Sequence, residues 1–362
     1  MSAAALAVLA WTVVAALFSA VTLWRLLRER PVAPGRRIPP LLLLRPVDEP
    51  TDAELDDLAH PLPPELPVRH VVVSPYRPRL APGIEWHFSD PPCPNRKVGH
   101  VLYALDTLRR DEQQILVVDA DVAVDRALVE GLSGALSAGA ALSTAAPLPE
   151  GGVGAGAVAL RGLLRSSHHS FVALDLMSAG PKTVCGKALG LSPAAAEALR
   201  GLDAHIGEDL ELSVLLHRRR MPVVRAFAPA RMPLGRMSLS GALRRLRRWM
   251  LVLRAHRPAL YPTVPLLLAP TPLLLALAIV LGDPAVVVAM GVLLVLRTAL
   301  GLALSRGTVD AVDGSWEWLV GESALLLAWV ASLAGRSVGW RGRSFVLQRG
   351  GRMERAVRGS ES

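Results

Sequence analysis

Two aspartates one residue apart are the first feature of this sequence that could do chemistry. Asp119 and Asp121 directly follow the apolar run "ILVV" at residues 115–118. Residues i and i+2 of a strand point the same way, so both carboxylates could be aimed at one point just past the strand end. Carboxylate oxygens suit Mg²⁺ or Mn²⁺, which bind one or two carboxylates together with substrate phosphates. The alternative is that the pair is only the polar end of a buried strand.

A second acidic pair opens the stretch "HIGEDLELSVLLHRRR", which has helical periodicity. The pattern predicts a helix that begins at Glu208 and Asp209. One of these carboxylates could act as the general base that deprotonates a hydroxyl. Acidic side chains are also stabilised at a helix N-terminus by the backbone dipole, so simple capping is the other explanation.

The third element is "RRLRRW" at residues 244–249. Arg245 and Arg248 lie at helical spacing, and they could hold a diphosphate leaving group by charge-assisted contacts while Trp249 packs on a sugar or an acceptor. Arginines beside apolar segments also bind lipid phosphates, and that alternative stays open.

The composition indicates the setting of these residues. The chain has 362 residues, of which 51% are hydrophobic and only 4% aromatic, and this favours a membrane protein. Lys and Arg number 40 against 31 Asp and Glu, and the basic residues crowd beside apolar segments. Aromatic residues interleaved with basic ones are scarce, so we expect no nucleic-acid partner. Cys93 and Cys185 lack paired ligand spacing, which gives no support to a zinc site.

The first apolar segment predicts a membrane anchor. Residues 3–23 are uncharged and long enough to cross a bilayer core, and arginines follow them rather than precede them. An uncleaved anchor with the next domain in the cytoplasm is therefore expected. The whole chain is predicted to comprise an N-terminal transmembrane anchor (1–30), an α/β catalytic domain (31–236), an interfacial amphipathic helix (237–257), a C-terminal transmembrane cluster (258–336) and a basic tail (337–362).

The C-terminal apolar spans, at about 264–281, 284–304 and 318–334, create a conflict. Together with the anchor they would make four crossings, which would put the tail outside, whereas its arginines favour the cytoplasm. Either the last span is re-entrant or the tail departs from the charge rule.

The stretch between the anchor and the interfacial helix has an α/β pattern. Short apolar runs at 40–47 and 68–75 predict buried strands, and Asp125 is placed to cap a helix. Alternation of strands and helices predicts a mostly parallel sheet, which binds ligands at the carboxyl ends of its strands. The Gly- and Ala-rich stretch 148–160 matches no nucleotide-binding spacing and predicts a flexible connection.

In chain order, D-x-D, E-D and R-x-x-R-W resemble the signature of processive and lipid-directed family-2-like glycosyltransferases. Three further stretches narrow the resemblance to ceramide glucosyltransferases and hopanoid-associated glycosyltransferases, a family-21-like group. They are "NRKVGHVLYAL" (95–105), "TVCGKALGLSP" (183–193) and "VGWRGRSFVLQRGG" (338–351).

The resemblance implies a GT-A fold with transmembrane helices at both ends, and a bacterial inner membrane protein whose catalytic domain faces the cytoplasm. It further implies inverting transfer from a UDP-sugar to a lipid hydroxyl, on a ceramide or hopanoid-like acceptor. The residues carried over are Asp121 with Asp119 for the metal (Mg²⁺ or Mn²⁺) and diphosphate, Asp209 as the base, Arg245 and Arg248 for the UDP leaving group, Trp249 and Glu208 on the acceptor side, and Lys97 as a donor contact.

One departure from the family pattern concerns the loop at Ser74. These families usually place there an aspartate that contacts uracil, whereas this chain reads "VVVSPYRP" without an acid. A degenerate glycosyltransferase that serves as a binding or scaffold subunit is therefore a second hypothesis. A polysaccharide synthase is a third, although three C-terminal spans are few for a translocation pore. The sugar and the lipid stay open.

Overall fold

The computed structural model of the chain describes every residue except 30–37, 49, 51–57, 59–61, 63–65, 111–113, 341–342 and 356–362. The chain forms two compact units, each assembled from three stretches. We call residues 31–148, 178–233 and 336–362 the sheet unit, and residues 1–30, 149–177 and 234–335 the helical unit. Of the arginines expected after the anchor, Arg25 and Arg28 belong to the first helix, whereas Arg30, Arg36 and Arg37 lie outside the described residues, as do the second and third residues of "WRGR" and the last seven tail residues.

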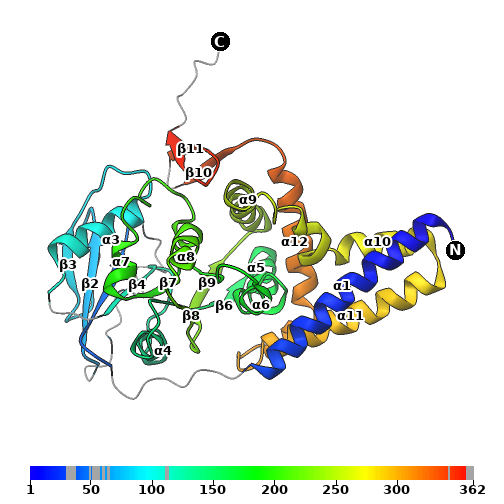
Figure 1. Ribbon diagram of the computed structural model, residues 1–362, viewed down its shortest axis with the longest axis horizontal. Helices are drawn as coiled ribbons and strands as arrows, with labels where there is room; N and C mark the ends of the chain where they lie inside the picture. The colour runs from blue at the N-terminus through cyan, green and yellow to red at the C-terminus, as the bar shows by residue number, and fades with distance from the viewer. Residues whose placement is uncertain are drawn as a thin grey trace, which may run out of the picture. The chain divides into compact units, whose positions relative to one another are not determined.

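The sheet unit is built on a seven-stranded sheet in the order β3-β2-β1-β4-β7-β5-β8 (Figure 1). Only β7 runs against its neighbours β4 and β5, while the other pairs are parallel. The prediction of an α/β domain with a mostly parallel sheet is confirmed. The strands are β1 (Leu41–Pro46), β2 (Val68–Ser74), β3 (Glu85–Phe88), β4 (Gln114–Val118), β5 (Leu142–Thr144), β7 (Ala188–Leu191) and β8 (Val223–Arg225).

Strand alternation divides the buried side chains between two faces of the sheet. Ile115 and Val117 of β4 pack in one cluster with helices α3 (Arg96–Thr107), α7 (Pro193–Glu197) and α8 (Glu208–Arg218). Leu116 and Val118 pack in the other cluster, with α4 (Arg126–Ser137). Each of these apolar side chains is almost fully buried, so burial of both faces holds the register of β4.

Several local predictions are confirmed. The two apolar runs form β1 and β2, and α8 begins at its acidic pair. The carboxylate of Asp125 caps α4 by accepting a hydrogen bond from the backbone N–H of Leu128 at 2.7 Å. The flexible connection predicted at 148–160 is wrong, because this stretch forms β6 (Pro147–Val153) and the start of α5 (Ala155–Ser166). Gly154, with φ of +101°, makes the turn between them, and the alanines that follow favour a helix.

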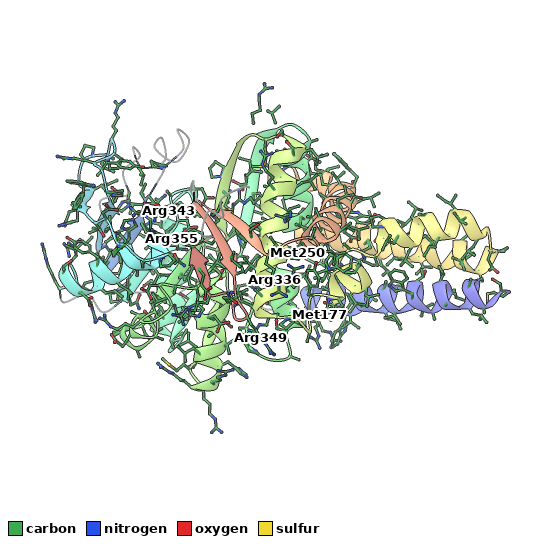
Figure 2. The ribbon with its side chains drawn as sticks, turned by 90° about the horizontal axis from the view of Figure 1, so that it is seen from above. Met177, Met250, Arg336, Arg343, Arg349 and Arg355 are labelled. Carbon is green, nitrogen blue, oxygen red and sulfur yellow. The ribbon has the colours of Figure 1, made fainter. Side chains whose placement is uncertain are left out.

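The basic tail folds as a small antiparallel sheet within the sheet unit. Its strands are β10 (Ser337–Trp340), β11 (Arg343–Leu347) and β12 (Met353–Arg355). The backbone N–H of Ile206 donates to Gly351 O at 3.0 Å, and that of Met353 donates to Ala204 O at 2.8 Å. The tail thus braces the loop that leads into α8. Arginines of this segment are exposed, and Figure 2 labels four of them: Arg336, Arg343, Arg349 and Arg355.

The helical unit contains two groups of helices. In the first, α5, α9 (Leu239–His256) and α12 (Glu317–Ser332) share one buried cluster. Helices α5 and α12 pack at glycines, since a Cβ at Gly162 would meet Glu317 O at 1.8 Å and one at Gly321 would meet Leu163 N at 2.4 Å. The carboxylate of Glu317 is fully buried and forms ion pairs with Arg161 and with Arg165, the latter at 2.8 Å.

The second group joins α1 (Ala3–Arg28), α10 (Thr271–Leu281) and α11 (Pro284–Leu304), which lie alongside one another (Figure 1). Ala5 near the start of α1 shares a cluster with Ala278 and Val286, which flank the α10–α11 turn. At the other end of α1, Arg25 donates to Leu176 O of α6 (Phe171–Met177) at 2.6 Å. The N-terminus and the α10–α11 turn therefore lie at the same end of this bundle.

Within the described residues, two helices are long and apolar enough to cross a membrane, α1 and α11, while α10 is apolar but shorter. Helix α12, which covers most of the last apolar span, does not meet that test. Its Glu322 is buried and pairs with Arg297 of α11 at 2.5 Å. The remaining elements are β9 (Ala230–Arg236), which pairs with β6, and the short helical turns η1 (Val264–Leu268) and η2 (Ala311–Ser315).

Candidate active site

A row of alternating charges lies at the carboxyl end of β4. Asp119 is the first residue after the strand, and its backbone N–H extends the pairing with β7 by donating to Lys187 O at 2.9 Å. Arg45 of β1 is buried and donates to the carbonyls of Ala120 and Val122 at 3.1 and 3.0 Å. The loop that carries the two aspartates is thus held from both sides of β4, by the backbone of Lys187 and by the side chain of Arg45.

The side chains of the row approach one another in strict alternation of sign. Lys187 Nζ lies 2.6 Å from Asp121 Oδ1 and 3.0 Å from Asp119 Oδ2. Lys97 Nζ, from the first turn of α3, lies 2.8 Å from Asp119 Oδ1 and 3.3 Å from Glu208 Oε1. The sheet unit therefore brings together five residues predicted from the sequence as site residues: Lys97, Asp119, Asp121, Glu208 and Asp209.

Gly186 connects this row to Asp209. Its backbone N–H donates to Asp209 Oδ2 at 2.7 Å, and its carbonyl accepts from Lys97 Nζ at 2.5 Å. A Cβ at this position would lie 3.2 Å from both Asp209 Oδ2 and Lys97 Nζ. The close approach of backbone to charged side chains explains why a glycine stands here.

Asn95 joins the starts of α3 and α8. Its Oδ1 caps α3 by accepting from the N–H of Val98 at 3.2 Å, and its Nδ2 donates to Glu208 Oε2 at 3.0 Å and to His205 O at 2.8 Å. Two helix N-termini thus face the same edge of the sheet. Their backbone dipoles favour negative charge there, such as that of a phosphate group.

The environment shifts the acidities of three groups in the row. Burial and the neighbouring charge of Glu208 raise the pKa of Asp209 to about 6, although Lys97 and two backbone N–H groups act against that rise. Burial would raise the pKa of Asp119, but Lys97 and Lys187 outweigh burial and hold it well below its usual range. Burial likewise opposes the charge of Lys97, but Asp119 and Glu208 raise the pKa of its ammonium. A pKa of about 6 suits Asp209 to exchange a proton near neutral pH.

The row remains accessible to a ligand. The side chains of Lys97, Lys187, Asp119 and Asp121 keep between 19% and 25% of their surface exposed. Charges in such half-buried surroundings interact more strongly than on an open surface, yet a substrate can still reach them.

A second polar group follows β1 and β2 along the same edge. Arg96 donates to Asp48 Oδ1 at 2.6 Å and pairs with Asp90 Oδ1 at 2.5 Å. Tyr76 donates its hydroxyl to Asp48 O at 2.5 Å, and Ser74, at the end of β2, accepts from the indole N–H of Trp86 at 3.0 Å. Asp48 is therefore buried as a partner of Arg96 near the position where the family-like pattern lacks its aspartate.

The remaining predicted residues belong to the helical unit. Trp249 on α9 stacks on His169 with ring centroids 6.5 Å apart, and the Arg245 guanidinium lies 5.5 Å from the Trp249 ring centroid. Arg248, one turn after Arg245, is half-buried on the same helix. The neighbouring Arg247 donates to carbonyls at the end of α12. The structure thus groups Arg245 and Trp249 on α9 of the helical unit.

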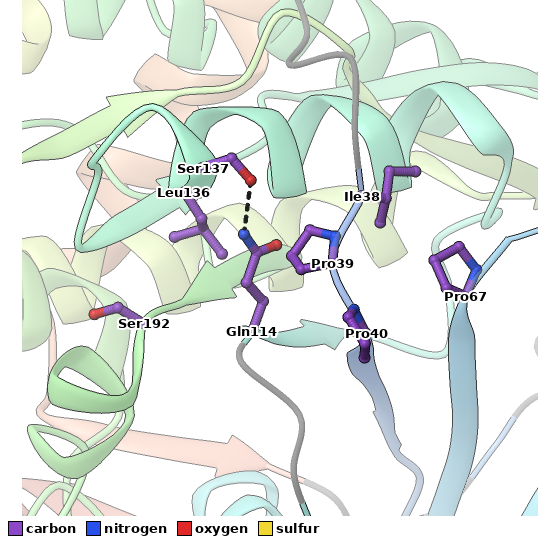
Figure 3. A pocket seen from close by; sticks show the side chains of 8 residues that line it. All are labelled: Ile38, Pro39, Pro40, Pro67, Gln114, Leu136, Ser137 and Ser192. Carbon is purple, nitrogen blue, oxygen red and sulfur yellow. Dashed lines mark hydrogen bonds between the residues drawn. The ribbon is translucent and has the colours of Figure 1, made fainter.

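A hollow of about 830 Å³ lies at the opposite edge of the sheet, at the amino ends of β1, β2 and β4. Figure 3 shows its lining, in which Gln114 donates to Ser137 at 3.0 Å. The eight lining residues carry no charge: Ile38, Pro39, Pro40, Pro67, Gln114, Leu136, Ser137 and Ser192. The position and uncharged lining of this hollow separate it from the row of charges, so we assign it no chemistry.

Few side chains in the described part of this site could coordinate a metal ion. Across the described residues, no group of three His, Cys, Asp or Glu side chains could hold a metal ion. Asp119 and Asp121 alone would give a two-carboxylate site that phosphate oxygens and water must complete, which is how Mg²⁺ is commonly bound. Both carboxylates are engaged by lysines, so these residues fit a divalent ion only if Lys187 leaves Asp121.

Comparison with known proteins decides the class of enzyme. The family model of "Glycosyl transferase family 21" matches residues 86–353, well over half of the chain. The chain belongs to this family. The row of charges therefore lies in a glycosyltransferase, and the family-21-like resemblance, to which the stretches 95–105, 183–193 and 338–351 narrowed the motif signature, is confirmed. No curated protein matches the chain significantly.

One solved structure supports the fold of this family 21 chain. A mannosyltransferase from Pyrobaculum calidifontis, in complex with GDP-Man and Mn²⁺, superposes with a TM-score of 0.50 at 14% identity, over 92% of this chain and 98% of that chain. A nucleotide-diphospho-sugar transferase from Desulfovibrio desulfuricans G20 matches with a TM-score of 0.31 at 10% identity, over 60% of this chain and 89% of that chain. The first similarity shows a shared glycosyltransferase fold over nearly the whole length.

Sequence reasoning missed three residues that the structure places in or beside the row. Lys187 lies within the stretch 183–193, and its signal in the sequence is that of a lone cation just before a short apolar strand. Asn95 was read as the start of a helix, without its contact to Glu208. Arg45 is a charged residue within an apolar strand. Its side chain is buried and donates to the aspartate loop, which it supports.

Proposed function

We propose that this family 21 chain is a membrane-bound inverting glycosyltransferase that moves a sugar from a UDP-sugar to a lipid hydroxyl. The observation that carries the proposal is the row from Asp121 to Asp209, in which two aspartates, two lysines and a carboxyl group of raised pKa share one edge of the sheet. Ceramide or a hopanoid-like lipid is the acceptor class that the motif resemblance favours.

Asp209 is proposed as the base. Single displacement at the anomeric carbon needs one group to take the proton of the attacking hydroxyl on the side opposite the leaving group. A carboxyl group whose pKa is raised to about 6 is a stronger base than an ordinary aspartate and is still ionised at neutral pH. Glu208 would lie on the acceptor side, where its charge maintains the raised pKa of Asp209.

The leaving diphosphate needs positive charge as its bond to the sugar breaks. Lys97 is proposed as a donor contact, since its ammonium lies between Asp119 and Glu208 and is partly exposed. Arg245 and Arg248 are proposed to steady the departing UDP, and Trp249 to line the acceptor side. Asp121 with Asp119 would hold Mg²⁺ or Mn²⁺, which would supply charge opposite the diphosphate.

The membrane arrangement follows from helix lengths and from the tail. Helix α1, with 26 residues, is about 39 Å long and α11, with 21, about 31 Å, enough for a hydrocarbon core of about 30 Å. We propose that α1 crosses once, that 264–281 and α11 form a hairpin across the membrane, and that α12 stays on the catalytic side. Two passes after the catalytic domain return the tail to the side of that domain, and this would resolve the conflict between apolar spans and arginines.

An activity assay tests the proposal. The full chain, purified in detergent, is incubated with labelled UDP-glucose, UDP-N-acetylglucosamine or GDP-mannose, a divalent metal and a bacterial lipid extract. A labelled glycolipid and release of the matching nucleotide are expected. The lack of any product or nucleotide release with every donor would instead support a scaffold role, which the missing acid at the Ser74 loop favours.

A further inference from the structure

Lys187 contacts three of the four carboxylate oxygens of Asp119 and Asp121, the pair that the sequence pattern predicts to bind a metal. Its ammonium lies 2.6 and 2.7 Å from the two oxygens of Asp121 and 3.0 Å from Asp119 Oδ2. An ammonium group has three N–H donors, and these three oxygens match them. Lys97 takes the remaining oxygen, Asp119 Oδ1, at 2.8 Å. Every carboxylate oxygen of the pair therefore contacts a lysine.

We propose that Lys187 is an internal cation which a divalent metal replaces at Asp121, so that the metal binds together with the nucleotide rather than alone. This inference rests on the proposed function, because it concerns how the donor complex enters. Metal and ammonium need the same oxygens, and their like charges repel at such short range. The two lysines also balance the charge of the two aspartates, so a bare metal ion meets a neutralised pair.

A nucleotide diphosphate changes this balance. Its phosphates add ligands for the metal and negative charge for the displaced ammonium, so the exchange becomes favourable when both arrive. The backbone around Lys187 need not move, since Lys187 O stays bonded to Asp119 N and the N–H of Gly186 stays bonded to Asp209. Only the flexible side chain must leave Asp121, and 20% of its surface is already exposed.

Lys187 thereby gains a second position, beside the diphosphate on the same edge of the sheet. The charge that holds the aspartates before the donor binds would stabilise the leaving group during transfer. This role differs from that of Lys97, which also contacts Glu208 and the backbone of Gly186 and so holds the base end of the row.

The experiment measures Mn²⁺ binding by electron paramagnetic resonance on the full chain in detergent, with and without UDP. The wild-type protein should bind Mn²⁺ weakly alone and much more tightly with UDP. Lys187→Met should bind Mn²⁺ alone about tenfold more tightly than wild type, as expected for removal of a competing cation. Its gain in Mn²⁺ affinity on addition of UDP should shrink correspondingly.

Two further variants complete the test. Lys182→Met removes the same charge from an exposed position on the same segment and should bind Mn²⁺ as wild type does. Lys187→Gln repeats the measurement if the methionine variant does not fold, as judged by circular dichroism. Unchanged Mn²⁺ affinity in the folded Lys187 variants, or an equal gain in Lys182→Met, would overturn the exchange. Because the readout needs no turnover, it decides on Lys187 even if no sugar is transferred, and turnover with unchanged Mn²⁺ affinity would leave the proposed function standing.

Discussion

The backbone N–H of Gly186 donates to Asp209 Oδ2 at 2.7 Å, and this bond joins the segment that carries Lys187 to the start of α8. The proposed base is therefore held by a backbone group rather than by a side chain that could change rotamer. The carbonyl of the same glycine accepts a hydrogen bond from Lys97 Nζ. Gly186 therefore orients both the proposed base and the lysine beside it.

Gly186→Ala should lower turnover while leaving the fold intact. The added Cβ would lie 3.2 Å from Asp209 Oδ2 and Lys97 Nζ, so both side chains must shift by a few tenths of an ångström. Gly180→Ala is the matched control, because a Cβ there meets nothing within 4 Å. Initial rates and melting temperatures of both variants decide the point. Equal activity in the two variants would show that this contact does not matter to catalysis.

The pH dependence of turnover should reveal Asp209. A base must be deprotonated, so kcat/KM should fall as the pH drops through about 6, the value to which burial and Glu208 raise the pKa of Asp209. Glu208→Gln removes a like charge and should move this acid limb to lower pH. Lys97→Met removes an opposing cation and should move it to higher pH. Shifts in the same direction in both variants would contradict the assignment.

Asp209→Asn should reduce the transfer rate by roughly 10²- to 10⁴-fold, the usual contribution of a general base. The amide keeps the shape of the side chain and can still meet the N–H of Gly186 through its oxygen. Binding of UDP, measured by calorimetry, should therefore stay close to that of wild type. A variant that transfers sugar at the wild-type rate would remove Asp209 from the mechanism.

The tail should be required for full activity. A chain that ends after Gln348 lacks β12 and the two backbone bonds that brace residues 204–206 ahead of α8. We expect a lower kcat with little change in nucleotide affinity, because the loosened loop leads into α8, which carries the proposed base, and not to the aspartate pair. A chain that ends after Arg355 keeps β12 and serves as the control for shortening. Equal kcat values in the two truncated chains would argue against bracing.

Reporter fusions should place the turn between α10 and α11 on the opposite side of the membrane from the tail. In a bacterial host, a periplasmic alkaline phosphatase fused after Asp283 should be active, whereas the same enzyme fused after Ser362 should be inactive. Green fluorescent protein at the C-terminus should fluoresce. An active phosphatase at the C-terminus would mean that α12 crosses the membrane as well.

Local patterns in the sequence were sufficient for the elements that carry the site. A run of apolar residues ending at two aspartates predicted β4 and its polar end, and the acidic pair at the start of an amphipathic stretch predicted where α8 begins. The alternation of side chains along β4 also explains the direction of Asp119. Asp119 follows Ile115 and Val117 at intervals of two residues, so it lies toward the face of the sheet that α3 and α8 cover.

Long-range partners could not be predicted in the same way. The pairing of Lys187 with Asp121 joins residues 66 positions apart, and its signal is a single lysine beside an apolar strand. The last apolar span shows the limit of hydropathy, since Glu317 and Glu322 pair with arginines inside the helical unit. Apolarity along a chain does not distinguish a helix that faces lipid from one that packs against protein.

The contact between the tail and the loop before α8 also bears on the order of synthesis. Strand β12 leaves the ribosome after α10 and α11, so the bonds that brace residues 204–206 cannot form until the hairpin has been made. A nascent chain would hold its aspartate pair early but complete the support of its base last. The full rate of sugar transfer would thus be reached only after α10 and α11 have been synthesised.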